Sequence, residues 1–176
     1  MNNETDNTPL FTRIFLLIVL AITIFSVATV FFGHEDAVGA RRPVYFLWLF
    51  TLLFVMRVGG QVLVALRPRR WLPPMFLWNL IPYPILLPLQ LIIIAIMLWI
   101  NLGFSANTGI ATIRNPDAGI MLVGFSTIYF AAMVIRYIVR MSRRPEQRWF
   151  GGAIPIVFHF VLASYLFFLG DFYAGT

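Results

Sequence analysis

The chain has 176 residues, of which 60% are hydrophobic and 11% are charged, and its formal net charge is +6. Its mean hydropathy is +0.86, whereas soluble domains are about 45–50% apolar and about 25% charged. A water-soluble protein of this size could not bury so much apolar surface, so the composition excludes a soluble globule and indicates an integral membrane protein. The absence of cysteine excludes disulfides, thiolate catalysis and iron–sulfur or zinc–thiolate sites.

The 13 basic residues of the chain are all arginines. Most of them flank long apolar segments, which is typical of residues that set membrane topology rather than of a nucleic-acid interface. We therefore expect membrane lipids, and no nucleic acid, as their partners. Arginine without lysine favours a GC-rich bacterial genome, so we expect a bacterial cytoplasmic (inner) membrane protein.

Five apolar stretches predict the fold, because each is close to the roughly 20 residues that a helix needs to cross a bilayer. They run over residues 14–32, 44–66, 81–102, 119–139 and 153–169. We expect an all-α polytopic bundle of five transmembrane helices that forms a single membrane domain over residues 1–176. The first stretch is interpreted as a span rather than a cleaved signal, because it is longer than a signal core and acidic residues precede it.

The placement of the arginines predicts the orientation of the chain in the membrane. A cytoplasmic N-terminus puts Arg41, Arg42 and Arg114 outside and Arg57 within the membrane. The remaining arginines then lie inside, at positions 13, 67, 69, 70, 136, 140, 143, 144 and 148. Such a bias follows the positive-inside rule, so we expect a cytoplasmic N-terminus and a periplasmic C-terminus.

Short sequence patterns predict local structure at three places, which are one connection between spans and the starts of two helices. Residues 71–79 combine aromatic side chains and methionine next to arginines, which predicts a short amphipathic segment on the cytoplasmic interface. Pro88 follows within the third span, so we expect that helix to start irregularly or to kink there. Before the fourth span, Asn115 or Asp117 is expected to cap the helix.

Arg57 is the most informative polar residue, because it lies ten residues before Arg67, about 15 Å along a helix and therefore near mid-bilayer. A charge at that depth costs roughly 2.5–3.5 kcal/mol on insertion scales and indicates a functional site. No Asp or Glu lies within the five predicted spans. Its counter-group must therefore be an amide, a backbone carbonyl, a lipid phosphate, a bound ligand or a carboxylate of another subunit. The alternative is an arginine that snorkels toward the interface.

Four further polar side chains fall at a similar depth on four predicted spans: Gln61 on the second, Gln90 on the third, Tyr129 on the fourth and His159 on the fifth. Because isolated polar groups are costly in lipid, we expect these side chains to face one another and Arg57. The sequence therefore predicts a midplane polar pocket for a ligand headgroup at these five residues. The same pattern also fits a hydrogen-bond cluster that only fixes helix packing.

His159 has two interpretations. A single histidine on a span can supply one axial bond to a haem iron or a chlorophyll magnesium, and it can equally be a buried, hydrogen-bonded residue. We expect no other metal ligands and no catalytic residues in this chain. The cofactor remains open between a quinone, a lipid and a tetrapyrrole.

The sequence favours a non-catalytic subunit of a larger membrane complex that binds the headgroup of a quinone, lipid or pigment. The small size, the short connections, the few catalytic residue types and Arg57 support this interpretation. It makes other membrane protein subunits the expected partners. The alternative is a small membrane-embedded enzyme or transporter acting on a lipophilic or anionic small molecule. The lack of a carboxylate in the predicted spans argues against that alternative, because carboxylates are common proton and cation relays.

Overall fold

The computed structural model describes residues 10–32, 42–66, 83–106, 108, 115–143 and 153–175. Within these ranges the secondary structure is all-helical, which confirms the predicted fold class. The helices are α1 (Leu10–Phe32), α2 (Arg42–Leu66), α3 (Tyr83–Ala106), α4 (Pro116–Arg143) and α5 (Ala153–Ala174). The predicted interfacial segment at residues 71–79 lies outside the described residues.

Four of the described helices are long and apolar enough to cross a membrane, over Val44–Leu66, Pro84–Ala106, Pro116–Arg143 and Ile154–Ala174. The chain is therefore a multi-pass membrane protein. The side chains of α1 are described over Leu10–Ser26, an apolar stretch shorter than the others. A crossing by α1 stays a prediction.

Each of the five described helices extends past its predicted span at one end or both; α4, for example, continues to Arg143 and α5 to Ala174. Hydropathy marks only the part of a helix that lies in hydrocarbon, whereas backbone hydrogen bonding continues through more polar residues. At the start of α4, the side-chain oxygen of Asn115 accepts a hydrogen bond from the backbone N–H of Ala118 at 3.1 Å. This contact confirms Asn115 as the cap of the helix.

The third helix runs as one element from Tyr83 with Pro88 inside it. A kink at Pro88 stays a prediction. An irregular start of the span also stays a prediction, because it was expected near residue 81 and residues 81 and 82 lie outside the described ranges.

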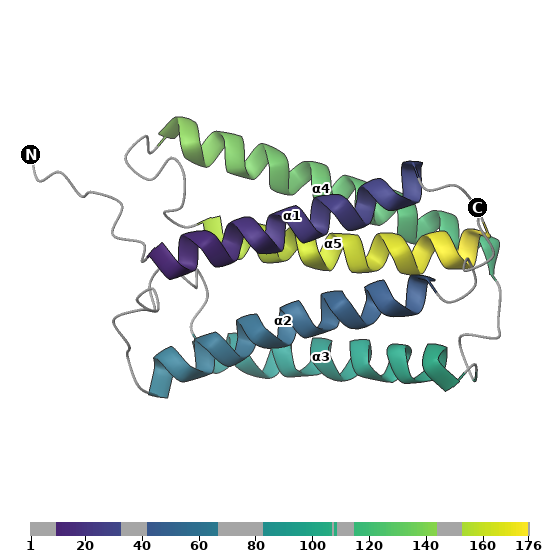
Figure 1. Cartoon of the computed structure of the whole chain (residues 1–176), viewed down its shortest axis with the longest axis horizontal. Helices are drawn as coiled ribbons and strands as arrows, with labels where there is room; N and C mark the ends of the chain where they lie inside the picture. The colour runs from purple at the N-terminus through teal and green to yellow at the C-terminus, as the bar shows by residue number, and fades with distance from the viewer. Residues whose placement is uncertain are drawn as a thin grey trace, which may run out of the picture.

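Helix α5 occupies the centre of the bundle. It packs against α1, α2 and α4, and α3 packs on α2 (Figure 1). Successive helices alternate in direction, so the first residues of α1 and α5 lie at one end of the bundle, here called the Ala153 end. The last residue of α5 lies at the other, the Ala174 end (Figure 1). The core between the helices is built from aromatic and aliphatic side chains, including Leu47, Phe50 and Phe158.

The α4–α5 contact depends on two glycines, Gly119 and Gly170. A Cβ atom on Gly119 would overlap the backbone of Tyr173 and Ala174, and one on Gly170 would lie 2.8 Å from the backbone nitrogen of Val123. The two helices therefore touch backbone to backbone, as is common where small residues line a membrane helix interface. This close contact holds the facing side chains of α4 and α5 at short range along the rest of the seam.

Candidate functional site

Tyr129 and His159 form a pair across the α4–α5 seam. The Tyr129 hydroxyl and His159 Nδ1 share a hydrogen bond, and the two rings meet edge to face with their centroids 5.7 Å apart. Phe125, one turn earlier on α4, stacks on Tyr129 at 6.0 Å and covers it. The structure therefore joins two of the five predicted site residues directly.

Arg57 projects from α2 toward α5 and is 7% exposed. Its guanidinium carbon lies 5.5 Å from the centroid of the Phe158 ring and 6.0 Å from that of Phe54. The positive charge of Arg57 is near enough to Tyr129 and His159 to interact electrostatically with both. Three predicted residues from three helices thus belong to one electrostatic unit, here called the Arg57–Tyr129–His159 cluster.

A second guanidinium adds positive charge to this cluster. Arg136 lies two turns after Tyr129 on the same face of α4, and its charge also acts on Tyr129 and His159. Within the described ranges the carboxylates are Asp117 and Asp171. Each lies twelve residues along its helix from the nearer member of the Tyr129–His159 pair, or about 18 Å toward the Ala174 end. The cluster is therefore strongly positive.

The hydrogen bonding of Arg57 is incomplete. Its Nε atom is buried and has no hydrogen-bond partner among the described residues. The aromatic faces of Phe54 and Phe158 stabilise the cation, but a ring face does not replace an oxygen acceptor for each N–H group. An acceptor from outside the described part of the chain would complete the site.

The two predicted glutamines are also buried. Gln61 lies one turn after Arg57 on α2 and is 0% exposed. Gln90 is 2% exposed, and neither atom of its side-chain amide has a hydrogen-bond partner within the described ranges. Gln90 lies three turns before Asn101 on α3, so it shares the face that packs on α2. The structure places Gln90 at the inner surface of the bundle without joining it to the Arg57–Tyr129–His159 cluster.

The sequence interpretation missed a second polar network, which ties α2, α3 and α5 together. Asn101 Nδ2 donates to Thr51 Oγ1 at 2.8 Å and to the carbonyl of Leu47 at 3.3 Å. The Tyr165 hydroxyl donates to Asn101 Oδ1 at 3.0 Å and contacts the carbonyl of Met97 at 3.3 Å. The sequence feature that could have indicated this network is Asn101, an isolated side-chain amide near the end of an apolar span.

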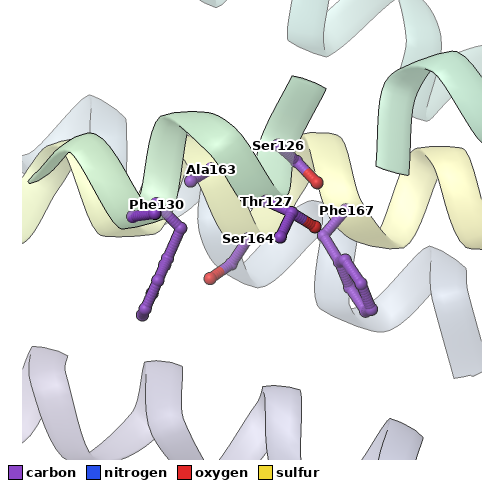
Figure 2. A pocket seen from close by; sticks show the side chains of 7 residues that line it. Ser126, Thr127, Phe130, Ala163, Ser164 and Phe167 are labelled. Atoms are coloured by element: carbon purple, nitrogen blue, oxygen red, sulfur yellow. The ribbon is translucent and has the colours of Figure 1, made fainter. Parts of the chain in front are cut away.

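A cavity of about 290 Å³ lies between α4 and α5. Figure 2 shows its lining side chains, which come only from these two helices: Ser126, Thr127, Phe130, Ala131, Ala163, Ser164 and Phe167. None of the five predicted site residues belongs to this lining. The cavity is therefore a feature separate from the polar cluster that the sequence predicted.

The chemistry available in the described residues is limited. No group of three or more His, Cys, Asp or Glu gathers in the part of the chain that the structure describes. The Nε2 atom of His159 could bind a metal only when Nδ1 carries the ring proton and donates it to Tyr129, since a protonated nitrogen cannot be a ligand. Comparisons with protein-family models, with curated proteins and with solved structures find no match to this chain.

Proposed function

We propose that this protein binds the anionic headgroup of a membrane lipid at the Arg57–Tyr129–His159 cluster, as a non-catalytic subunit of a larger inner-membrane complex. The observation that carries the proposal is the buried guanidinium of Arg57, whose Nε has no acceptor among the described residues. Of the quinone, lipid and pigment headgroups that the sequence leaves open, an anionic one matches the charge best, because Arg136 adds a second positive charge.

The free-energy argument starts from the cost of the charge. A guanidinium stays ionised in proteins and offers five N–H donors. Two aromatic faces contribute about 0.5–2 kcal/mol each through cation–π interactions, against roughly 2.5–3.5 kcal/mol for a central charge on insertion scales. Together the rings contribute about 1–4 kcal/mol and can offset much of the cost of the charge, but they leave the Nε donor without an oxygen acceptor. A phosphate or carboxylate supplies both the negative charge and two or more acceptors in the geometry that arginine prefers.

The subunit role rests on what the chain lacks. Most of the described chain consists of helices that could span a membrane, so little of it is left to form a separate catalytic domain. The polar cluster contains no nucleophile with an adjacent carboxylate. These features support a scaffold that holds a lipid at an interface with other membrane subunits.

One observation favours a second candidate, a small membrane-embedded enzyme. A tyrosine hydroxyl hydrogen-bonded to an imidazole, as in Tyr129 and His159, can pass a proton. A monodisperse small species that turns over a lipophilic compound, and that loses turnover in Tyr129→Phe, would favour this candidate over a lipid-binding subunit.

The test replaces Arg57 with methionine, which keeps much of the side-chain length and removes the charge. The protein is extracted in a mild detergent, and its bound phospholipids are measured by native mass spectrometry beside the size of the complex that it forms. We expect Arg57→Met to weaken binding of anionic phospholipid by about 10- to 100-fold, the range for hydrogen bonds to charged groups. The complex should shrink with the loss of the lipid.

Arg143→Met is the matched control, because Arg143 is exposed at the end of α4, away from the cluster. This variant removes the same charge from the chain and should keep both lipid and complex. If Arg57→Met inserts normally and retains the same phospholipid and the same complex as Arg143→Met, then Arg57 is a packing residue and the proposal is wrong.

A further inference from the structure

The cavity between α4 and α5 contains a polar group that its own helix leaves unsatisfied. Ser164 is 2% exposed, and its hydroxyl has no hydrogen-bond partner among the residues that the structure describes. Figure 2 shows the Ser164 hydroxyl pointing to the same side as the rings of Phe130 and Phe167, into the space that these residues line.

Other serines and threonines in the described helices show that this situation is unusual. Apart from Thr12, which lies in the first turn of α1 and also has a buried hydroxyl without a partner among the described residues, their hydroxyls donate to the carbonyl three or four residues earlier. This is the ordinary way to satisfy a hydroxyl within a helix. This holds for Thr23, Ser26, Thr51, Ser105, Ser126, Thr127 and Ser142. Two of these, Ser126 and Thr127, line the same cavity, but their hydroxyl protons are already engaged in hydrogen bonds to the carbonyl of Val123. Ser164 therefore supplies the free donor of this cavity.

We propose that the cavity binds a flat, largely apolar ring that carries a carbonyl group, of the quinone class, with the Ser164 hydroxyl donating to that carbonyl. The volume of about 290 Å³ lies just below the range for ligand pockets, about 300–1,000 Å³, which suits a ring system rather than a large cofactor. The Phe130 and Phe167 rings provide aromatic walls for it.

The depth of Ser164 distinguishes this occupant from a phospholipid. Ser164 lies eleven residues after Ala153 and ten before Ala174, so it is about 15 Å or more from either end of α5. The hydrocarbon core is about 30 Å thick, so the ester and phosphate oxygens of a phospholipid lie about 15 Å from its centre. An acyl chain that reached Ser164 would bring no acceptor. No charged side chain lines the cavity, so nothing there would draw a phosphate to this depth as Arg57 could at its own site. A carbonyl beside Ser164 must therefore belong to a molecule that dissolves in the hydrocarbon itself.

The test compares two probes of nearly the same shape, 2-methyl-1,4-naphthoquinone and 2-methylnaphthalene, which lacks the carbonyls. Binding is measured as the rise of the thermal unfolding midpoint of the purified protein with probe concentration. We expect the wild-type protein to bind the quinone about three- to tenfold more tightly than the hydrocarbon, as one neutral hydrogen bond allows. Ser164→Ala should bind the two probes equally.

A second pair of variants tests the location. Ala131 is exposed and lines the cavity, so Ala131→Phe should fill its mouth and weaken binding of both probes without disturbing the core. Ala132 is also exposed but does not line the cavity, so Ala132→Phe should leave binding unchanged. Arg57→Met should leave it unchanged too, which separates this site from the lipid site proposed above.

Three results would each overturn the proposal. The first is equal binding of both probes by the wild-type protein, which would make the cavity an unselective apolar crevice. The second is a preference for the quinone that survives in Ser164→Ala. The third is the absence of binding of either probe to the wild-type protein.

Discussion

Replacing Gly170 with alanine tests whether the α4–α5 seam depends on backbone contact. The added Cβ would lie 2.8 Å from the nitrogen of Val123, 2.9 Å from the Cβ of Leu122 and 3.0 Å from the carbonyl oxygen of Gly119. Two of these atoms belong to the backbone of α4, so no flexible side chain can move aside, and the helices must separate. Overpacking of this kind costs about 1–3 kcal/mol, and we expect the upper part of that range.

Helix propensity acts in the opposite direction, because alanine stabilises a helix interior by about 1 kcal/mol relative to glycine. Gly124→Ala measures that gain alone, since nothing lies within 4 Å of a Cβ at Gly124. The difference between the two variants therefore isolates the crowding at Gly170. We expect Gly170→Ala to be less stable than Gly124→Ala by about 2–3 kcal/mol, which is roughly a 30- to 150-fold change in the unfolding equilibrium.

The assay is reversible unfolding in mixed micelles, in which increasing amounts of a denaturing detergent are added and helix content is followed by circular dichroism. The cavity between α4 and α5 lies along the same seam as Tyr129 and His159, so Gly170→Ala should also weaken binding of the naphthoquinone probe. Equal stability of the Gly170 and Gly124 variants would refute the claim that close backbone contact holds α4 and α5 together.

Two other predictions address the buried network and the topology. Asn101→Leu removes the acceptor of Tyr165 and the donor to Thr51, so it should destabilise the protein by about 1–2 kcal/mol in the same unfolding assay. No loss of stability would mean that the network is replaceable by packing alone. The chain has no cysteine, so a Thr176→Cys variant can be labelled at one site with a membrane-impermeant reagent. The predicted orientation requires labelling from the periplasmic side, and labelling from the cytoplasmic side alone would contradict it.

The fold class could be predicted from the sequence because lipid leaves a backbone few alternatives. A long apolar segment must satisfy its N–H and C=O groups internally, so hydropathy alone indicates helices. The ends of α4 and α5 were less predictable, because helical hydrogen bonding continues into segments that are no longer apolar. The cap at Asn115 was predictable, since its role depends on neighbouring backbone only.

The members of the candidate site could be selected from the sequence because polar residues in lipid are costly wherever they occur. Their pairing could not, since it depends on which helices are neighbours and how each is rotated. Tyr129 meets His159 because α4 and α5 approach closely at Gly119 and Gly170, and no sequence pattern reports that approach. Ser164 was missed for a related reason. A serine in an apolar span usually donates to its own helix, and only the structure shows that this one does not.

The distribution of satisfied polar groups separates structural from functional roles along the bundle. Toward the Ala174 end, Asn101 and Tyr165 close a network in which donors meet acceptors, so that network needs nothing from outside the chain. Toward the Ala153 end, Arg57 and Gln90 are as deeply buried but have donors without acceptors among the described residues. If polar groups served only to fix helix packing, Arg57 should be as well satisfied as Asn101 and Tyr165, because an unsatisfied group costs stability and contributes nothing to packing. The unsatisfied Nε of Arg57 therefore supports an external acceptor at the Arg57–Tyr129–His159 cluster.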